Sequence, residues 1–427
     1  MDFWILNIFL DIVRSLPQMI TEPTFLVVTA IVLFLVYRQY LNIAEQKQRM
    51  YGAEGQDPRW QTLRALGYGI LGGFLASLLF IILGISLSHA GIIYVWPLAL
   101  ILMLIYPRFL CFSYGGGIVA ACSLIVGWPE VDVPSLMSLV AILHLVEAIL
   151  IYFTGAQDPL PVYVRKEDGQ VVGGFLLQKF WPLPFIGLFS ILLTSEFMVD
   201  FATMPQWWPL IRPSIEVPAD GILVYFPWLV VAAVGYGDIA LSNHPKEKTR
   251  FSAGSLLVFA MVLLVLAVLG SQWLPLQYVA TLFAPIGHEL VIFLGRWREE
   301  RRKGVFTNDD GPMVLDVLPH SIAKEVGLAT GDIIRSVNRV PVETWYQVFE
   351  TRLYTDVELE VENIFDGSRR IISLPQSSAH LGVIPAPSAY SRFNVDYGAG
   401  QRPGRLGRLL ARLWRRLFPS RHFPKGD

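Results

Sequence analysis

The stretch Ser321-Ile-Ala-Lys-Glu-Val-Gly-Leu-Ala-Thr-Gly-Asp-Ile-Ile-Arg-Ser-Val-Asn338 decides how the last third of this 427-residue chain folds. Ser321 is a good N-cap for a short helix over 321–326, and Gly327 is placed to end that helix in a left-handed conformation. Gly331 and Asp332 then turn the chain into an apolar strand over 333–338. The stretch therefore predicts a helix, a turn and a strand in close succession.

Further elements are expected on both sides of this stretch. A strand over 313–318 precedes it, and an amphipathic helix begins near Thr344. Two strands, over 357–365 and 368–374, close the unit. Asp366-Gly367 joins them and is typical of a two-residue type I′ hairpin turn. The sequence thus predicts a C-terminal α+β domain over 300–376.

The order of these elements, with the helix-Gly-Leu-x-x-Gly-Asp-x-Ile run, resembles a bacterial-type PDZ domain. The resemblance implies that an extended peptide binds by strand addition beside a helix. The alternative is a small α+β domain without an open groove. Two segments are candidates for the loop that holds the peptide carboxylate, and one helix face is the candidate for the opposite wall. These groove candidates are Gly304, Val305 and Phe306, or Leu381, Gly382 and Val383, facing Trp345, Val348 and Phe349.

The remainder of the chain is strongly apolar. The chain is 53% hydrophobic and only 16% charged, with a mean hydropathy of +0.48 and the apolar excess before residue 296. This composition predicts a polytopic α-helical membrane bundle over 21–296, with about eight or nine spans. The candidate spans are 22–38, 66–88, 91–106, 109–127, 134–153, 181–199, 221–241, 252–270 and 278–295.

Lysine and arginine set the expected orientation of these spans. They cluster in alternate connections, the last cluster running from Arg296 to Lys303. This pattern predicts a cell-membrane protein whose C-terminal domain and C-terminus are cytoplasmic, and the resemblance to a bacterial-type PDZ domain implies that the membrane is bacterial. A small cytoplasmic hairpin is expected around Asp168-Gly169, and Asp238 is expected to cap a helix or to pair with Lys246. No cleavable signal peptide is expected, because the N-terminus lacks a basic flank and a small-residue cleavage site.

Both ends of the chain carry amphipathic patterns. Residues 1–20 predict an interfacial helix, and a linker over 377–402 leads to a basic amphipathic helix over 403–420. We expect the latter to bind anionic lipids; a partner-binding helix, or a segment disordered in solution, is the alternative. Nucleic acid is not expected, since the apolar stripe would then have no use. The apolar face carries Trp414, and the basic residues of the other face are Arg405, Arg408, Arg412, Arg415 and Arg416.

Ionisable residues inside candidate spans mark the second possible site. His144 and Glu147 share a helix face in one span, and His288 and Glu289 are adjacent in another. A zinc peptidase motif would need a second histidine at position 292, which is Ile292 here. We therefore expect these four residues to form a polar lock between helices, with no catalytic residue, metal or cofactor. Cys111 and Cys122 suggest neither a disulfide nor a metal framework.

A membrane His-Glu pair beside a PDZ-like unit also resembles the site-2 protease family. In that family the motif lies in an early helix, and an Asp-Gly ligand motif follows the PDZ unit. Here Asp220-Gly221 precedes His288, and no span follows the PDZ-like unit. A divergent intramembrane metallopeptidase using His288 and Glu289 is therefore the alternative function, rather than the expected one.

The whole arrangement resembles the MinJ-like family of cell-division topology proteins of Firmicutes. The similarity covers the order of segments, the Tyr-Gly-Asp-Ile-Ala run at 236–240, and the Gly-His-Glu run at 287–289. It implies a non-enzymatic scaffold that recruits division-site proteins through the PDZ domain and gathers at septum and poles. The partners it implies are DivIVA-like and MinD-like proteins.

Overall fold

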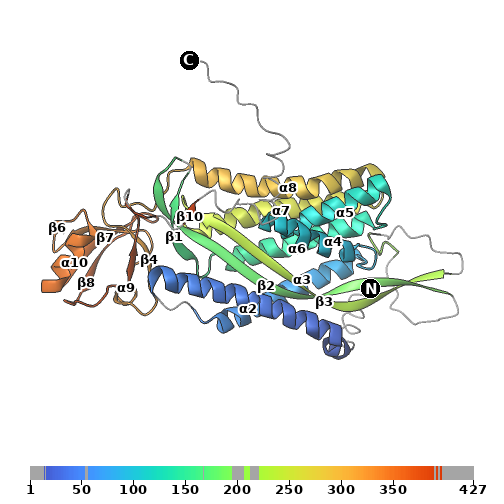
Figure 1. The fold of residues 1–427 in the computed structure, drawn as a ribbon, viewed down its shortest axis with the longest axis horizontal. Helices are drawn as coiled ribbons and strands as arrows, with labels where there is room; N and C mark the ends of the chain where they lie inside the picture. The colour runs from blue at the N-terminus through green and yellow to red at the C-terminus, as the bar shows by residue number, and fades with distance from the viewer. Residues whose placement is uncertain are drawn as a thin grey trace, which may run out of the picture.

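The computed structural model describes residues 14, 16–52, 56–166, 168–194, 206–211, 221–388, 391–392 and 395–396. Figure 1 shows an elongated molecule in which a helical bundle surrounds a long β-hairpin and an α+β domain lies at one end. The predicted class, a helical membrane part with a C-terminal α+β domain, is confirmed.

Five helices in the described residues are long and apolar enough to cross a membrane, so the chain is a multi-pass membrane protein. Each has proline at its first turn, where the missing amide hydrogen costs no helix hydrogen bond. Two shorter apolar helices are joined by a 3₁₀ turn, η1 (Pro107–Leu110). The long helices are α2 (Pro23–Tyr51), α3 (Pro58–Leu83), α6 (Val133–Thr154), α7 (Pro245–Gly270) and α8 (Leu274–Arg301); the short ones are α4 (Ile92–Ile105) and α5 (Phe112–Val126).

The candidate spans at 181–199 and 221–241 form strands over 181–194 and 221–240, so their prediction as helices is wrong. β2 (Val171–Thr194) and β3 (Gly221–Ala240) pair in antiparallel register from Phe175 opposite Ala240 to Thr194 opposite Gly221. An unbroken apolar run has the same composition in a buried strand as in a spanning helix, and hydrophobic periodicity does not distinguish the two. Together with the short α4 and α5, this leaves fewer helical spans than the eight or nine expected.

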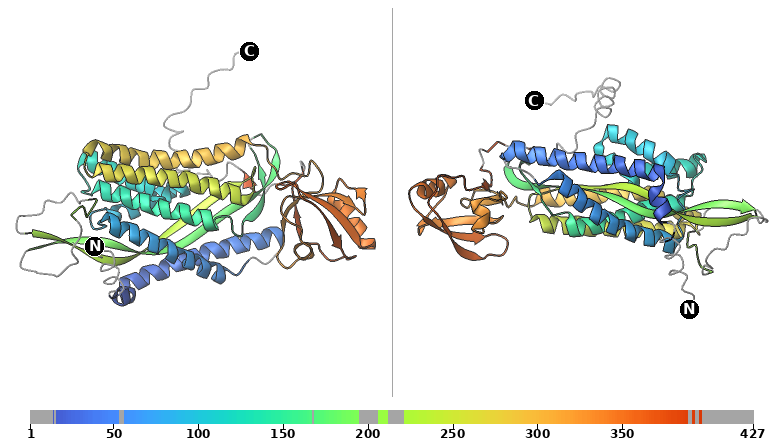
Figure 2. Two further views of the ribbon diagram at one scale, coloured as in Figure 1. Left: turned by 180° about the vertical axis from the view of Figure 1, so that it is seen from behind. Right: turned by 90° about the horizontal axis from the view of Figure 1, so that it is seen from below.

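The hairpin crosses the bundle obliquely between α2 on one side and α7 and α8 on the other, and its tip projects past the far end (Figures 1 and 2). Near the α+β domain, β2 also pairs with β1 (Leu160–Arg165), which confirms the small hairpin expected around Asp168-Gly169. β10 (Val395–Asp396) pairs parallel to β1.

Beyond Leu176, the second edge of β2 pairs with none of the named strands of the described residues. Helices α2 and α3 cover most of it, and the segment after α3 meets it at Leu188, whose carbonyl accepts from the Leu87 amide over 2.7 Å. Pro182 and Pro184 carry no amide hydrogen to satisfy. The Tyr40 hydroxyl donates to the Phe180 carbonyl over 2.9 Å. Since an unpaired backbone group is costly inside a membrane, these contacts are what permit a strand at this depth.

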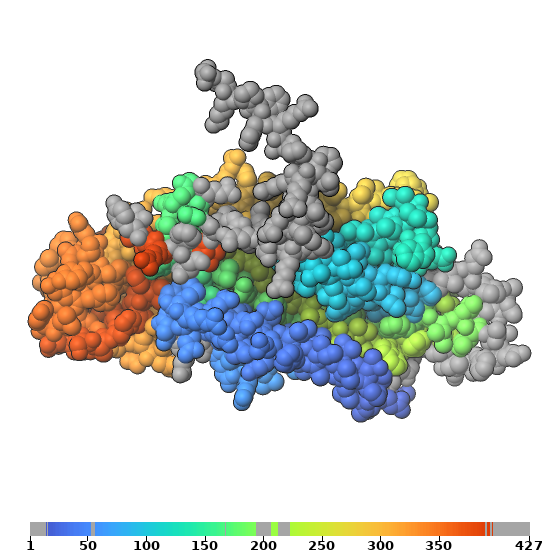
Figure 3. Space-filling model, viewed as in Figure 1, coloured from blue at the N-terminus to red at the C-terminus, as the bar shows by residue number. Residues whose placement is uncertain are grey.

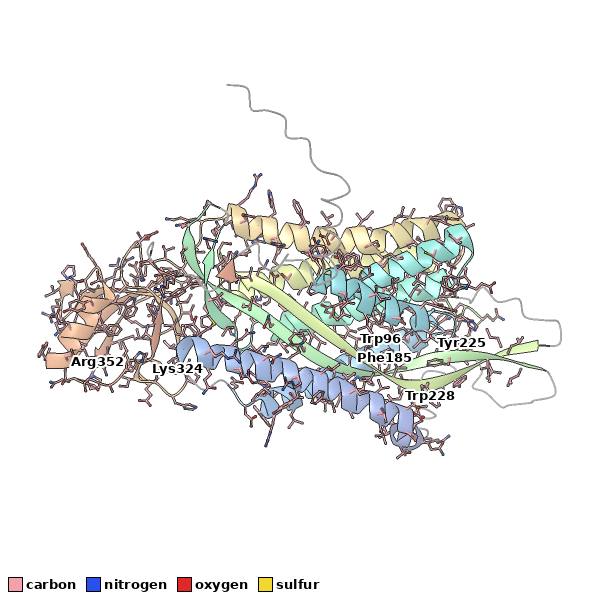
Figure 4. The ribbon with its side chains drawn as sticks, in the orientation of Figure 1. Trp96, Phe185, Tyr225, Trp228, Lys324 and Arg352 are labelled. Atoms are coloured by element: carbon pink, nitrogen blue, oxygen red, sulfur yellow. The ribbon has the colours of Figure 1, made fainter. Side chains whose placement is uncertain are left out.

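Small residues of α3 let this helix lie directly against β2. A Cβ added at Gly69 would lie 1.8 Å from the Pro182 carbonyl oxygen, and one at Gly73 would lie 1.7 Å from that of Pro184. One turn further, the Ile186 amide donates to the Ser77 hydroxyl over 2.8 Å. Side chains of α3 and β2 also pack closely: the Phe185 ring (Figure 4) stacks on the Phe80 ring with centroids 5.2 Å apart.

The α+β domain follows the predicted order, with one difference at a turn. Ser321 accepts from the Lys324 amide at the start of the first helix, and Gly327 has a φ of +86° at its end. Asn363 donates to Ser368, so a wider loop replaces the expected two-residue turn at Asp366-Gly367. The elements are β4 (Val314–Val317), α9 (Ile322–Glu325), β5 (Asp332–Val337), β6 (Val340–Pro341), α10 (Trp345–Tyr354), β7 (Val357–Asn363), β8 (Arg369–Leu374) and β9 (Val383–Pro385).

These strands form a sheet in the order β6-β5-β7-β8 and a separate β4-β9 pair. The domain packs directly on the bundle: its surface continues into those of α2 and the hairpin (Figure 3), and Met313, Leu315 and Ile333 belong to the same apolar core as the helices.

A buried polar cluster joins β3, α7 and α8 near this junction. The Lys248 ammonium contacts the Asp238 carboxylate at 3.2 Å and donates to the Gly295 carbonyl at 2.9 Å. One Glu299 oxygen accepts from the Leu241 and Ser242 amides, each at 2.8 Å. Asp238 therefore pairs with Lys248 rather than with the expected Lys246.

Candidate functional site

Helices α4 and α5 form a re-entrant hairpin that begins and ends at the same end of the bundle. Its outer ends meet where the Asp132 amide donates to the His89 carbonyl over 2.7 Å. At 14 and 15 residues, each helix rises about 21 Å and does not cross a hydrocarbon core of ~30 Å. α5 lies along the first half of α8, with Gly117 against Pro285. The turn between α4 and α5 therefore lies near mid-depth, beside the middles of α6 and α8.

This turn brings Cys111 to two histidines. Cys111 is the N-cap of α5, and its Sγ accepts from the Ser113 amide over 3.4 Å. The same sulfur lies 3.0 Å from Nε2 of His144, on α6, and 3.7 Å from Nε2 of His288, on α8. The sulfur and a nitrogen from each ring all lie within 4.8 Å of one another. Residues 33 and 177 positions from Cys111 in sequence thus meet at one point.

Glu289 is directed to a different group of residues. Its Oε1 lies 3.0 Å from the Arg108 guanidinium, and its Oε2 accepts from the Tyr114 hydroxyl over 2.6 Å. The Arg108 guanidinium also lies over the Tyr106 and Phe109 rings, 5.6 and 5.3 Å from their centroids. This ion pair accounts for an arginine near mid-depth, because charged groups inside a membrane are paired or line a cavity.

The four residues expected to form a polar lock therefore divide into separate groups. His144 and His288 lie together, with ring centroids 5.1 Å apart. Glu289 joins Arg108, and Glu147 lies one turn along α6 from His144, outside the group of three candidate ligand atoms. Cys111 was missed as a site residue. One signal in the sequence could have indicated the turn at Cys111. The two apolar segments on either side of Arg108, which form α4 and α5, are each too short to span a membrane.

Three of the groove candidates are part of the junction instead. Phe306 is fully buried, its carbonyl accepts from the Gly173 amide over 2.8 Å, and its ring lies 5.3 Å from that of Phe175. The Val305 amide donates to Leu241, and Gly304 packs on Val172. This segment is thus not an open peptide site: Gly304 and Phe306 are buried, and the Val305 amide and the Phe306 carbonyl are already hydrogen-bonded to Leu241 and Gly173.

The other candidate segment does lie beside a strand. The carbonyls of Leu381 and Gly382 accept from the Ala323 and Leu318 amides, and Gly382 has a φ of +80° that favours glycine. β9 then pairs with β4 along one edge. Antiparallel alternation directs the backbone groups of Val383 to the opposite edge.

Helix α10 lies next to the segment that leads into β9. The Arg352 guanidinium (Figure 4) donates to the carbonyls of Pro375 and Ala379, at 3.3 and 2.8 Å. Val348 is buried, whereas Phe349 is 40% exposed and stacks on Trp345 with centroids 5.5 Å apart. The predicted helix face thus presents exposed aromatic surface around a buried valine.

Two predicted segments lie outside the described residues. These are most of the N-terminal interfacial helix and the basic tail with Arg405, Arg408, Arg412, Trp414, Arg415 and Arg416. Their membrane binding stays a prediction.

The described structure is thus of a definite class: a multi-pass membrane protein with a re-entrant helical hairpin, an internal β-hairpin and a packed α+β domain. The chain is 25% identical over 237 residues to the cell division topological determinant MinJ of Bacillus subtilis (strain 168). The match covers 54% of this chain and 55% of MinJ, so the chain spans about half the length of that relative. No protein-family model matches. The similarity to MinJ-like proteins expected from the sequence is confirmed.

Proposed function

We propose that this protein is a non-enzymatic membrane scaffold that positions division-site proteins; support comes from its similarity to MinJ, which is named a cell division topological determinant. The α+β domain would be a PDZ domain that recruits partners. Two observations together support the proposal. The chain is similar to MinJ, and its α+β domain places the aromatic face of α10 beside the segment that leads into β9.

The orientation of the domain follows from its charges. The helix ends on the side of the bundle that carries the domain hold Lys47, Arg64, Lys246 and Arg296, among others, whereas the short connections 84–91, 127–132 and 271–273 hold neither lysine nor arginine. Arg108 lies in neither group of connections, because it is paired with Glu289 near mid-depth. Positively charged connections favour the cytoplasm, so we propose that the domain is cytoplasmic.

The groove would accept an extended peptide beside Leu381–Val383. Peptide binding by strand addition uses an unpaired edge for backbone hydrogen bonds and neighbouring pockets for side chains. Here Val383 offers the edge, and Trp345 and Phe349 offer apolar surface. The Tyr163 hydroxyl donates to the Pro385 carbonyl over 2.8 Å, which limits the groove at that end. The ligand chemistry that fits is a short extended segment with an apolar side chain.

The alternative metallopeptidase is disfavoured by the position of Glu289. A glutamate that acts as a general base must reach the metal-bound water. The Glu289 carboxylate is instead held by Arg108 and Tyr114, and it lies outside the group of three candidate ligand atoms.

The test is localisation of fluorescent fusions of the full chain in dividing cells. Deleting residues 304–376 would expose the apolar core around the hairpin and could unfold the protein. Point variants therefore test the groove more directly. Phe349→Glu places a charge in the groove, and Tyr346→Glu, on the same helix but 69% exposed, is the control.

We expect the wild-type chain and Tyr346→Glu to gather at septa and poles and Phe349→Glu to disperse. Even distribution of all three proteins would reject the division role. Septal Phe349→Glu would reject the groove as the recruiting surface.

A further inference from the structure

Three electron-pair donors converge between the re-entrant turn and the helices behind it. The Cys111 sulfur approaches Nε2 of His144 at 3.0 Å and Nε2 of His288 at 3.7 Å. The His144 side chain is buried, and the Phe259 ring packs against both imidazoles, with centroids 5.4 and 5.7 Å away. Whether hydrogen bonds or a cation can link these three atoms depends on which ring nitrogens carry hydrogen.

The hydrogen on His144 can be assigned from its other nitrogen. Nδ1 lies 2.6 Å from the carbonyl oxygen of Val140, and a carbonyl only accepts hydrogen bonds. Nδ1 therefore carries the hydrogen, and in the neutral ring Nε2 presents a lone pair to Cys111. This arrangement, with Nδ1 bonded to a backbone carbonyl and Nε2 free, is the usual one for a metal-bound histidine.

The same assignment holds for His288. Its Nδ1 lies 3.4 Å from the Tyr114 hydroxyl, whose own hydrogen is directed to Glu289 over 2.6 Å. The hydroxyl oxygen can therefore accept from Nδ1, which leaves Nε2 with a lone pair toward Cys111. Arg108 neutralises Glu289 at the far end of this chain of contacts.

Two lone pairs and one sulfur thus face a common point. A thiol has one hydrogen, which can serve only one of the two nitrogens, and the Ser113 hydroxyl, 3.2 Å from Nε2 of His144, can serve the other; a cation at the centre would satisfy the sulfur and both nitrogens at once. We propose that Cys111, His144 and His288 bind one Zn²⁺ ion. Zinc accepts thiolate and imidazole at roughly 2.3 and 2.0 Å in tetrahedral geometry, which separates neighbouring ligand atoms by about 3.5 Å. The two sulfur–nitrogen distances, 3.0 and 3.7 Å, lie on either side of that value.

The ion would fasten the turn of the re-entrant hairpin to α6 and α8. Binding converts the Cys111 thiol to a thiolate and releases its proton to solvent. Three protein ligands leave a fourth position open, and the Ser113 hydroxyl lies nearby, 3.2 Å from Nε2 of His144. The site does not depend on the proposed scaffold function, and it implies no hydrolytic activity.

Metal analysis of the full chain, purified in detergent and dialysed against Zn²⁺ and then buffer, tests the site. Cys111→Ser and His288→Ala remove ligands, and Cys122→Ser, in the same helix α5, is the matched control. We expect about one zinc ion per chain in the wild type and in Cys122→Ser, and a loss of about tenfold or more in the ligand variants. Equal zinc in Cys111→Ser and Cys122→Ser would overturn the proposal.

A second measurement leaves all three ligands intact, in case the ligand variants fail to fold. In Cys122→Ser, Cys111 is the sole cysteine of the chain. Its labelling by a membrane-permeant maleimide should slow at least about tenfold when Zn²⁺ is added and recover with a chelator, because a coordinated thiolate is not free to react. Cobalt should add a sulfur-to-metal absorption band to the same protein. A labelling rate indifferent to zinc, or a cobalt spectrum without that band, would contradict the site.

Discussion

Two of the sheets in the described residues, the one that contains β2 and β3 and the one that contains β5 and β7, lie in opposite surroundings. In the α+β domain, β7 alternates buried and exposed residues, and its glutamates face outward. In the bundle, β2 has buried apolar residues such as Trp181 and Leu183, and its unpaired edge is covered by Tyr40, Gly73 and Ser77. Water satisfies whatever a surface strand leaves unpaired, whereas a strand at membrane depth needs a protein partner for each group. Changes at the membrane hairpin should therefore cost far more than matched changes elsewhere.

The largest effect should come from filling the space between α3 and β2. Gly73→Ile places a side chain where the Pro184 carbonyl lies 1.7 Å from the Cβ position, and backbone cannot move aside as a side chain can. We expect a loss of at least about 3 kcal/mol in the free energy of unfolding, measured by denaturant titration in detergent micelles. Gly67→Ile, on the same helix with open space around it, should change stability by less than about 1 kcal/mol. Equal stability of the two variants would show that helix and strand do not touch.

Ion pairs should also contribute more to stability inside the bundle than at the exposed surface. Arg108→Met leaves Glu289 charged beside the re-entrant turn and should destabilise the protein by about 3 kcal/mol, since an uncompensated charge within a bundle is costly. The double variant Arg108→Met with Glu289→Leu should recover most of this loss. Arg49→Met, which breaks an exposed pair with Glu45, should cost about 0.5 kcal/mol or less. If the double variant is no more stable than Arg108→Met, the pair has been misassigned.

The stability contribution of a single serine hydrogen bond can be compared between the two sheets. Ser77→Ala removes the acceptor of the Ile186 amide in an apolar environment and should cost about 2 kcal/mol. Ser336→Ala removes a bond from β5 to Glu360, which is exposed and can bind water instead, so about 0.5 kcal/mol is expected. Thermal unfolding of both variants measures the difference, and a larger loss in Ser336→Ala would reverse the comparison.

The smallest effects concern pH and two carboxylates of the α+β domain. Burial raises the pKa of Asp316 above 3.8, so its contribution to stability is fully present below that pH and is lost as the pH rises through the folded value. The hydrogen bond from Arg335 lowers the pKa of Glu362 below 4.5, so its contribution is present above that pH and is lost as the pH falls.

Asp316→Asn should therefore raise the unfolding midpoint at pH 7, and Glu362→Gln should lower it. The difference in unfolding midpoint between each variant and the wild type should become smaller as the pH approaches 4. Midpoints measured from pH 4 to 8 test this, and shifts of equal sign at pH 7 would contradict the assigned causes.

Local patterns were sufficient wherever the structure is set by near neighbours in the chain. The α+β order follows from a cap at Ser321, a left-handed Gly327 and the spacing of apolar residues in α10, and all three are present as expected. The membrane class follows from the length of the apolar runs, and five of those expected are helices long enough to cross. At these places the backbone conformation depends on a few adjacent residues, so the sequence by itself determines it.

Only the tertiary structure decided the rest. The segments 181–194 and 221–240 are as apolar as spanning helices, but they pair with each other as strands, and Gly69, Gly73 and Ser77 of α3 cover the edge of β2 that β3 leaves unpaired. Cys111, His144 and His288 come from three helices, and no pattern within any one of them announces the other two. Groups far apart in sequence meet through the packing of whole elements, and packing depends on the shapes of all the surfaces at once.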